Sequence, residues 1–486
     1  MNLLRRSLFI TFFSTGATTS VQFVVTLIIA RLLSPTEIGI FSITSIFIGL
    51  AAVFRDFGVS AYLQREKDLT NKKMRSALGV LLTAAWILAG VIFFASEYVA
   101  AFYEQPGIAE VMRVLTISFA LVPFASYHHA LLARDLRAEK EAIVKGIGTI
   151  VFAGTCITLA FYQFSYLALA WANVANIIST IITYLILKPT GIPIFPSFRG
   201  WKEPFKFGSG SIVGNLMDQL NNAIPDLVLG KLTSAHDVGM YSRANGLVGI
   251  FHQIVWPTVS YNAVPYIAKN YHSNVPLAPI MAQATSYLTG IAWPIFIVTA
   301  LYAKELLNVL YGSQWIQAAP LVAFISCQAA IRIGYSLTRP TLLAIGKPYL
   351  PVFSSGIGAF GRVIAILLLG QDLLSFALAL CIADFITLIA PAWLMSRYVG
   401  YSYRLAFSAF WPSVKVSAIC FVSVFLTTLL IPATLPDFLK LIIVGIVLLC
   451  VWVFSIIFLK HPLHKEISSV LKRLMQTRIA TKNTIG

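Results

Sequence analysis

The chain has 486 residues, of which 58% are hydrophobic and only 11% are charged, and its formal net charge at pH 7 is +17. A soluble domain has about a quarter of its residues charged, and a folded surface in water needs polar cover. This composition therefore excludes a water-soluble globular protein and indicates that the chain folds in lipid. The positive charge does not indicate a nucleic-acid partner, because the basic residues lie in short connections between apolar runs, where they face anionic lipid.

Fourteen apolar stretches are each long enough to cross the membrane, because a helix rises about 1.5 Å per residue and the hydrocarbon core is about 30 Å thick. They lie near residues 8–32, 39–63, 76–100, 109–133, 143–163, 165–187, 206–230, 240–266, 281–303, 316–338, 350–369, 373–395, 409–431 and 438–459. The first is too long for the apolar part of a cleavable signal peptide, so we predict a membrane helix there. The sequence thus predicts an all-α integral membrane protein with about fourteen transmembrane helices.

The Lys and Arg residues of the connections fall mostly on the side of the membrane that holds the N-terminus. The connection after the second span, for example, carries Arg65, Lys67, Lys72, Lys73 and Arg75. Cytoplasmic loops carry such an excess, so we expect both termini in the cytoplasm. The connections on the other side are short, which disfavours a membrane glycosyltransferase or polymerase with catalytic residues in a large outer loop. We therefore expect no enzymatic activity.

The cysteines and histidines do not form a metal-binding pattern. The five cysteines lie inside apolar runs and lack C-x-x-C spacing, so we expect neither a disulfide nor a metal site. The adjacent His128 and His129 diverge by about 100° on a helix and do not readily share a metal ion. Because the sequence also lacks a Walker loop and a G-x-G-x-x-G motif, we expect no cofactor.

An internal repeat relates residues 30–42 to residues 230–242. Leu32, Ser34, Gly39 and Ser42 match Leu232, Ser234, Gly239 and Ser242, and Gly49 and Ser60 match Gly249 and Ser260 at the same offset. Parallel repeats are one plan of transporters, with the substrate path between the repeats; the alternative is an old duplication without a transport role. We predict two parallel six-helix lobes over 1–195 and 196–400, a terminal transmembrane hairpin over 401–460 and a basic cytoplasmic tail over 461–486.

A polar stripe follows one face of the first helix of each predicted lobe. In the first span it consists of Thr11, Thr15, Thr18, Thr19, Gln22 and Thr26, and in the seventh of Ser211, Asn215, Asp218, Gln219, Asn222 and Asp226. The spacing keeps these side chains on the same face of a helix. In the first span the stripe could bind helices together by hydrogen bonds or line a cavity. For the seventh we expect a water-filled cavity, because carboxylates are costly in lipid.

Further charges lie within the predicted spans, where ionisable residues are functional candidates. Arg55 next to Asp56 could form a local ion pair or an interface anchor, and Arg362 and Asp384 on consecutive spans could neutralise each other. Arginines in a cavity suit an anionic substrate, whereas a carboxylate suits a proton or a coupling cation. The candidate substrate-binding residues are Arg55, Arg332, Arg362, Gln22, Asn215, Gln219 and Asn222. The candidate ion-coupling residues are Asp218, Asp226 and Asp384.

Several segments resemble the polysaccharide-transporter flippases of bacteria. Ala30-Arg31-Leu32-Leu33-Ser34-Pro35, leading to Gly39, is similar to their "ARLLSP…G" signature after the first helix. Phe54-Arg55-Asp56-Phe57-Gly58-Val59 and then Leu63-Gln64-Arg65 resemble "DFGL…LIQR", and Arg134-Asp135-Leu136-Arg137 resembles "RDLRF", although Ala138 departs from it. Gln314-Trp315 and Ala344-Ile345-Gly346-Lys347 also fall where the family has similar residues. The resemblance covers essentially the whole chain.

These are the Wzx-type exporters of O-antigen and exopolysaccharides, in a superfamily with drug/cation antiporters and the peptidoglycan-precursor flippase. The resemblance implies a flippase that moves an undecaprenyl-diphosphate-linked oligosaccharide across the bacterial inner membrane by alternating access. It implies Arg332 and Arg362 as contacts of the diphosphate or acidic sugars, a lipid-tail groove at the last helix pair, and an H⁺ or Na⁺ gradient as the driving force. Expected partners are lipid-linked oligosaccharide, membrane lipid, a polysaccharide polymerase and glycosyltransferases. The alternatives are a drug or metabolite cation antiporter and a passive lipid scramblase.

Overall fold

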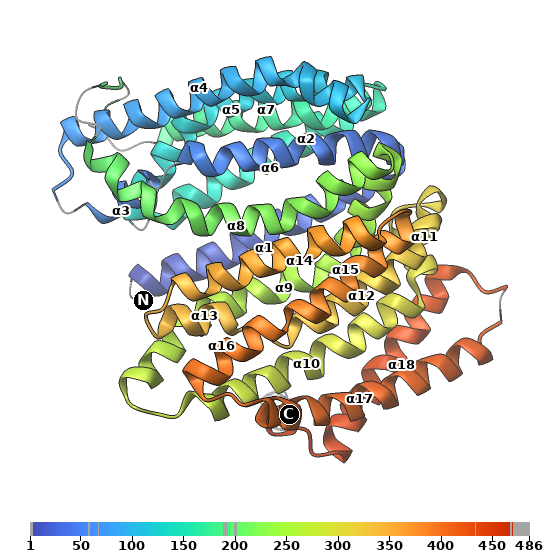
Figure 1. Ribbon diagram of the computed structural model, residues 1–486. Coiled ribbons are helices and arrows are strands. Elements are labelled where there is room, and N and C mark those ends of the chain that lie inside the picture. The colour runs from blue at the N-terminus through green and yellow to red at the C-terminus, as the bar shows by residue number, and fades with distance from the viewer. Residues whose placement is uncertain are drawn as a thin grey trace, which may run out of the picture. The chain divides into compact units, whose positions relative to one another are not determined.

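The computed structural model describes residues 3–56, 59–66, 68–135, 137–187, 193, 195–198, 202–432, 434–466 and 469, and every regular element within them is a helix. The chain forms two compact units, Met1–Ser242 and Arg243–Gly486 (Figure 1). Each unit has its own packed helices and its own buried apolar side chains.

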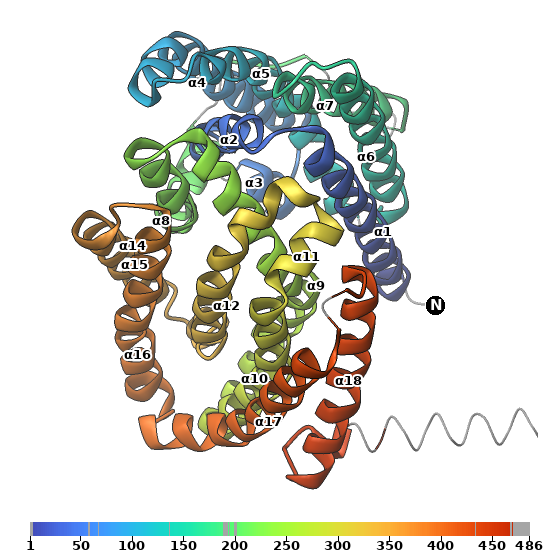
Figure 2. The same ribbon diagram turned by 90° about the vertical axis from the view of Figure 1, so that its right-hand side faces the viewer.

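The first unit contains eight helices and the start of a ninth among the described residues. They are α1 Leu3–Leu32, α2 Pro35–Asp56, α3 Val59–Arg65, α4 Asn71–Tyr103, α5 Pro106–Arg134, α6 Ala138–Phe161, α7 Leu167–Leu187, α8 Lys202–Leu232 and the first residues of α9 Ala235–His272. Helix α4 packs along α5, and α6 packs between α1 and α7 (Figure 2). The turn between α4 and α5 is sharp because Glu104 is left-handed, with a φ of 55°, and α5 then begins at Pro106, a residue favoured in the first helical turn.

The second unit contains the rest of α9 and ten further elements among the described residues. They are α10 Leu277–Leu301, α11 Ala303–Leu310, the 3₁₀-helix η1 Ser313–Ala318, α12 Ala319–Ile333, α13 Thr338–Ala344, α14 Tyr349–Leu369, α15 Leu373–Thr387, α16 Ile389–Val399, α17 Tyr403–Leu430 and α18 Asp437–Phe458. Helix α10 packs against α12 and α17, α14 packs against α15, and α17 pairs with α18 (Figure 2).

Twelve helices in the described part of the chain are long and apolar enough to cross a membrane. This confirms an all-α, multi-pass membrane protein. The predicted spans 206–230 and 240–266 fall within α8 and α9, which are long enough but are not among the twelve. Polar residues such as Asn222 and Asp226 make α8 less apolar than its neighbours. The predicted number of fourteen is therefore not confirmed, and the division at residue 195 stays a prediction.

The repeated segments begin α2 and α9 in the same way. The Ser34 hydroxyl donates to a Glu37 carboxylate oxygen at 2.8 Å, and that oxygen also accepts from the Ser34 backbone N–H at 2.6 Å. In the second copy the Ser234 hydroxyl donates to Asp237 at 3.0 Å, and the Asp237 backbone N–H donates to the Ser234 hydroxyl oxygen at 3.2 Å. Each Ser-x-x-acid segment therefore caps N–H groups at a helix start that have no partner within the helix. The repeated residues thus have the same structural role in both copies.

The two capped helix starts also contact each other, within the unit Met1–Ser242. A Cβ added to Gly39 would lie 2.7 Å from the carbonyl carbon of Ala235, and one added to Gly239 would lie 2.7 Å from the carbonyl carbon of Pro35. The Ser42 hydroxyl donates to the Ser242 hydroxyl oxygen at 3.1 Å. The contact is therefore reciprocal between the two copies, and it requires glycine at both matching positions because a Cβ would meet backbone atoms that no side-chain rotation can move.

His461, just after α18, links the end of the helix pair α17–α18 to α10 through side-chain hydrogen bonds. Its side chain is 1% exposed, and its Nε2 lies 3.0 Å from the Ser413 hydroxyl on α17 and 3.3 Å from the Ser286 hydroxyl on α10. The Leu463 backbone N–H donates to Nδ1 at 3.2 Å, so the neutral ring carries its proton on Nε2. Burial lowers the pKa of His461 to about 4.

We expect this histidine to make the protein less stable as the pH falls from about 6.5 to about 4. An unfolded histidine has a pKa of about 6.5, so over this range the unfolded chain takes up a proton that the folded chain does not, which favours unfolding. The Tm in detergent, measured from pH 7 to pH 5, should fall more for the wild type than for His461→Gln. His272→Gln, at an exposed position, is the control. An equal fall in wild type and His461→Gln would contradict the assignment.

Candidate functional site

A polar pocket of about 470 Å³ lies in the first unit among α1, α5, α6 and α7. Its charged and titratable lining consists of His129, Glu141 and Lys145, and its amides are Gln22 and Asn176. Its hydroxyl groups belong to Thr18, Ser126, Thr149, Thr180 and Tyr184. Polar groups are costly to bury in lipid unless they are satisfied, so a cluster of this size within membrane helices points to a ligand or to water.

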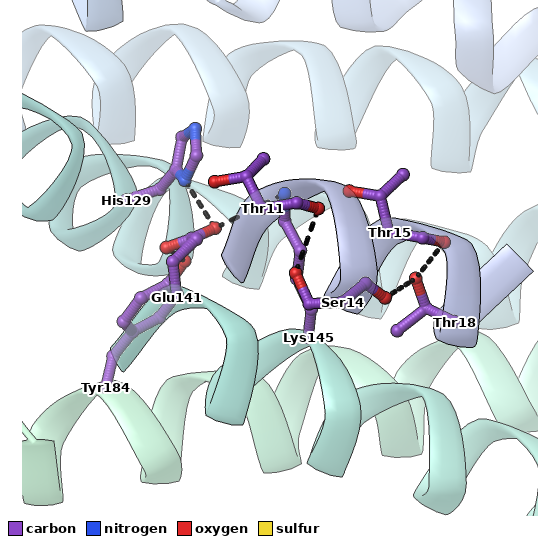
Figure 3. A network of polar contacts seen from close by, with 8 residues as sticks. All are labelled: Thr11, Ser14, Thr15, Thr18, His129, Glu141, Lys145 and Tyr184. Carbon is purple, nitrogen blue, oxygen red and sulfur yellow. Dashed lines mark hydrogen bonds and ion pairs between the residues drawn. The ribbon is translucent and has the colours of Figure 1, made fainter. Parts of the chain in front are cut away.

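Glu141 is the centre of this network (Figure 3). Its carboxylate accepts a hydrogen bond from the Tyr184 hydroxyl at 2.9 Å and lies 2.7 Å from Nδ1 of His129. The ammonium group of Lys145, one turn further along α6, lies 3.8 Å from the same carboxylate. These groups come together because α5 ends at Arg134 and α6 begins at Ala138, so the short connection places the last turns of α5 beside the first turn of α6.

Gly148 lets α7 bring two polar side chains against α6. A Cβ at this position would lie 2.6 Å from Oδ1 of Asn176 and 2.9 Å from the hydroxyl oxygen of Thr180. The Thr180 hydroxyl donates to Asn176 Oδ1 at 3.3 Å. The absence of a side chain on α6 therefore keeps both groups at the wall of the pocket.

The sequence predicted only part of this pocket. Gln22 and Thr18 belong to the polar stripe of the first span, and both line the pocket. Glu141, Lys145 and His129 were not among the predicted site residues; of the three, only His129 was considered, as a poor candidate for a shared metal site. The spacing of Glu141 and Lys145 places both on one face of α6, but it does not show which helix that face meets.

A second cluster lies in the other unit, where α12, α14 and α15 meet. Asp384 on α15 is 2% exposed, and one of its carboxylate oxygens accepts a hydrogen bond from Nε of Arg362 at 2.8 Å and lies 2.7 Å from Nη2 of the same guanidinium. Arg332 on α12 places its Nε 3.9 Å from the other carboxylate oxygen, and its side chain is 52% exposed. Arg362 and Asp384 therefore form a buried pair, as one of the two interpretations of the sequence expected, with a more accessible arginine beside it.

The remaining predicted residues lie elsewhere in the first unit. Arg55 is buried with its guanidinium 4.7 Å from the centroid of the Phe119 ring. Gln219 lies against α2, where its amide nitrogen would be 2.5 Å from a Cβ added to Gly49. Asn222 is exposed, and Asp226 has a buried carboxylate oxygen with no hydrogen-bond partner among the described residues.

The side chains of Asn215 and Asp218 lie outside the part of the structure that is described. The predicted roles of all these residues in substrate binding or ion coupling stay predictions.

Comparison with known proteins places the chain among membrane proteins of polysaccharide assembly. Residues 28–320 match the family described as "Polysaccharide biosynthesis protein". The chain is 22% identical over 416 residues to the Teichuronic acid biosynthesis protein TuaB of Bacillus subtilis (strain 168), covering 82% of this chain and 83% of the relative. It is 22% identical over 393 residues to the Succinoglycan biosynthesis transport protein ExoT of Rhizobium meliloti (strain 1021), covering 79% of this chain and 78% of the relative.

The fold is similar to that of a solved transporter structure. The structure titled "Lipid II flippase MurJ, inward closed conformation" superposes with a TM-score of 0.72 at 15% sequence identity, covering 93% of this chain and 98% of that chain. At this identity the likeness shows a common fold. The covered share is large enough that the likeness extends over both units.

Proposed function

The chain belongs to the polysaccharide biosynthesis protein family, and from that premise we propose that it is a flippase. It moves an undecaprenyl-diphosphate-linked oligosaccharide repeat unit across the bacterial inner membrane by alternating access. The multi-pass helical fold and the names of its relatives, which concern biosynthesis and transport of bacterial polysaccharides, support a transporter rather than an enzyme. Glycosyltransferases would supply such a lipid-linked substrate, and a polymerase would consume it.

The observation that carries the proposal furthest is the cluster of Arg332, Arg362 and Asp384. Two guanidinium groups against one carboxylate leave a net positive charge within apolar helices. Guanidinium groups bind phosphate oxygens through forked hydrogen bonds, so the cluster suits a diphosphate. Arg332 is the group that a substrate reaches first, because half of its side chain is exposed.

A drug or metabolite cation antiporter is the less favoured alternative, because this cluster would repel a cationic substrate. A passive lipid scramblase would need no energy source. We propose that transport is instead coupled to H⁺ or Na⁺, with Asp226 and Asp384 as the described candidates. The buried, unpartnered carboxylate oxygen of Asp226 supports a site that is completed by a proton or a cation.

Deletion of the gene should make lipid-linked repeat units accumulate in the inner membrane and should abolish the surface polysaccharide. Wild-type protein should clear the accumulated lipid, whereas Arg332→Glu should not, because a carboxylate would repel the diphosphate. Arg404→Glu, at an exposed position in the first turn of α17, should complement normally. Mass spectrometry of the extracted lipids is the measurement. A deletion strain with unchanged lipids and normal surface polymer would reject the proposed function.

A further inference from the structure

We propose that the pocket among α1, α5, α6 and α7 is a carbohydrate subsite that holds a neutral sugar of the transported molecule. The inference rests on the proposed function and adds to it a separate place for the sugar. Three features of the pocket carry it, namely its charge balance, its hydrogen-bonding groups and its size.

The charge balance of the pocket favours a neutral ligand. The Glu141 carboxylate already faces the Lys145 ammonium at 3.8 Å and the His129 ring at 2.7 Å, so its charge is offset by its own neighbours. A diphosphate would need an excess of cationic groups. A metal cation would need oxygen ligands, and the carboxylate of this pocket is held by an ammonium group and two further donors. Neither ion therefore fits as well as an uncharged molecule.

The hydrogen-bonding groups match a molecule that carries many hydroxyls. A sugar hydroxyl both donates and accepts, and a carboxamide side chain offers both a donor and an acceptor. The Asn176 oxygen accepts from Thr180, which turns the amide so that its NH₂ group can donate to a ligand. Gln22 on α1 is exposed at the pocket wall, and the hydroxyls of Ser126 and Thr149 lie on the facing helices α5 and α6.

The size of the pocket suits a sugar rather than a single ion. Its volume of about 470 Å³ lies within the usual range of small-molecule sites, about 300–1,000 Å³. Along α6 the lining runs from Glu141 to Thr149, which is about 12 Å of helix at 1.5 Å per residue. Gly148 maintains part of this space, because any side chain there would push Asn176 and Thr180 away.

The test measures binding of the free sugar to the whole protein. The probe is the oligosaccharide released by mild acid from the lipid that accumulates when the gene is deleted, titrated calorimetrically into full-length protein in lipid nanodiscs. Gln22→Ala and Asn176→Ala should each raise the Kd about tenfold, since each removes hydrogen bonds to the ligand. Gln22 is exposed on α1, so its removal leaves the packing intact.

The matched control is Asn173→Ala, one turn away on the same helix α7. The Asn173 amide donates to the Leu169 carbonyl at 2.8 Å and is not part of the pocket wall, so its removal should leave the Kd within about twofold of the wild type. Equal affinities of wild type, Gln22→Ala and Asn176→Ala would overturn the carbohydrate subsite.

Unchanged sugar affinity combined with an altered Na⁺ or pH dependence of transport would also overturn the subsite and would make the pocket a cation site. Failure of the proposed function has a different signature, because in that case the deletion strain accumulates no lipid-linked oligosaccharide at all. Accumulation of the lipid together with normal binding by both variants would reject the subsite alone.

Discussion

Replacing Arg362 with alanine is expected to lower the free energy of unfolding by about 3–5 kcal/mol, because the substitution leaves an uncompensated charge in a buried site. Asp384 is 2% exposed, and its carboxylate accepts a hydrogen bond from Nε of Arg362 and forms an ion pair with the same guanidinium. The Tm in detergent and the amount of protein in the membrane should both fall. Arg404→Ala, at an exposed position, should leave both unchanged.

A double variant separates the structural role of this pair from its role in transport. Arg362→Met combined with Asp384→Leu removes both charges, and such replacements of a buried pair are often neutral or stabilising. We therefore expect the double variant to regain the Tm while surface polysaccharide stays absent. Recovery of both stability and surface polysaccharide would mean that the pair only holds α14 and α15 together.

We expect the second large loss of stability from Gly39→Ala or Gly239→Ala, at the two matching glycines of the repeat. A Cβ at Gly39 or Gly239 would meet backbone atoms of Ala235 or Pro35, so α2 and α9 would have to separate. Overpacking typically costs about 1–3 kcal/mol, and we expect the upper part of this range because backbone cannot rotate away as a side chain can. The Ser42–Ser242 hydrogen bond of 3.1 Å should be lost with it.

Gly249→Ala provides the matched control for this prediction. It lies on the same helix α9, and a Cβ there would meet nothing within 4 Å. Alanine is favoured over glycine in helices by about 1 kcal/mol, so the Tm should stay the same or rise. Thermal unfolding of the three purified variants is the measurement. If Gly239→Ala unfolds at the same temperature as Gly249→Ala, the close contact of the repeats is wrong.

Hydropathy predicted the all-helical, multi-pass fold because lipid imposes simple rules on single helices. The spans of α4, α5, α10 and α18 follow from length and composition alone. The spans 206–230 and 240–266 were also predicted from the length of an apolar stretch, but the helices that contain them, α8 and α9, are not among the twelve that are apolar enough to cross a membrane. The polar residues that make a helix a candidate for substrate or ion binding therefore also lower its hydropathy, by which a membrane helix is recognised.

Site residues could be predicted only where they stand out by polarity or charge within a single helix. The stripe with Gln22 and the charges at Arg362 and Asp384 were visible because each stands out within its own span. The contact of Gly39 with Gly239 could not be predicted from the sequence, since a repeat shows that two segments are related but not that they touch. The pocket around Glu141 also needed the packing of α1, α6 and α7, which no spacing along the chain reveals.

The central claim is most directly tested by measuring flipping of lipid-linked oligosaccharide by the purified protein. Protein reconstituted into liposomes with the lipid extracted from the deletion strain should move it between leaflets, as judged by the fraction that an impermeant glycosidase can cleave over time. An imposed H⁺ or Na⁺ gradient should speed this movement, and an ionophore should abolish the effect. If the cleavable fraction stays the same as in protein-free liposomes under every gradient, the protein is not a flippase for this lipid.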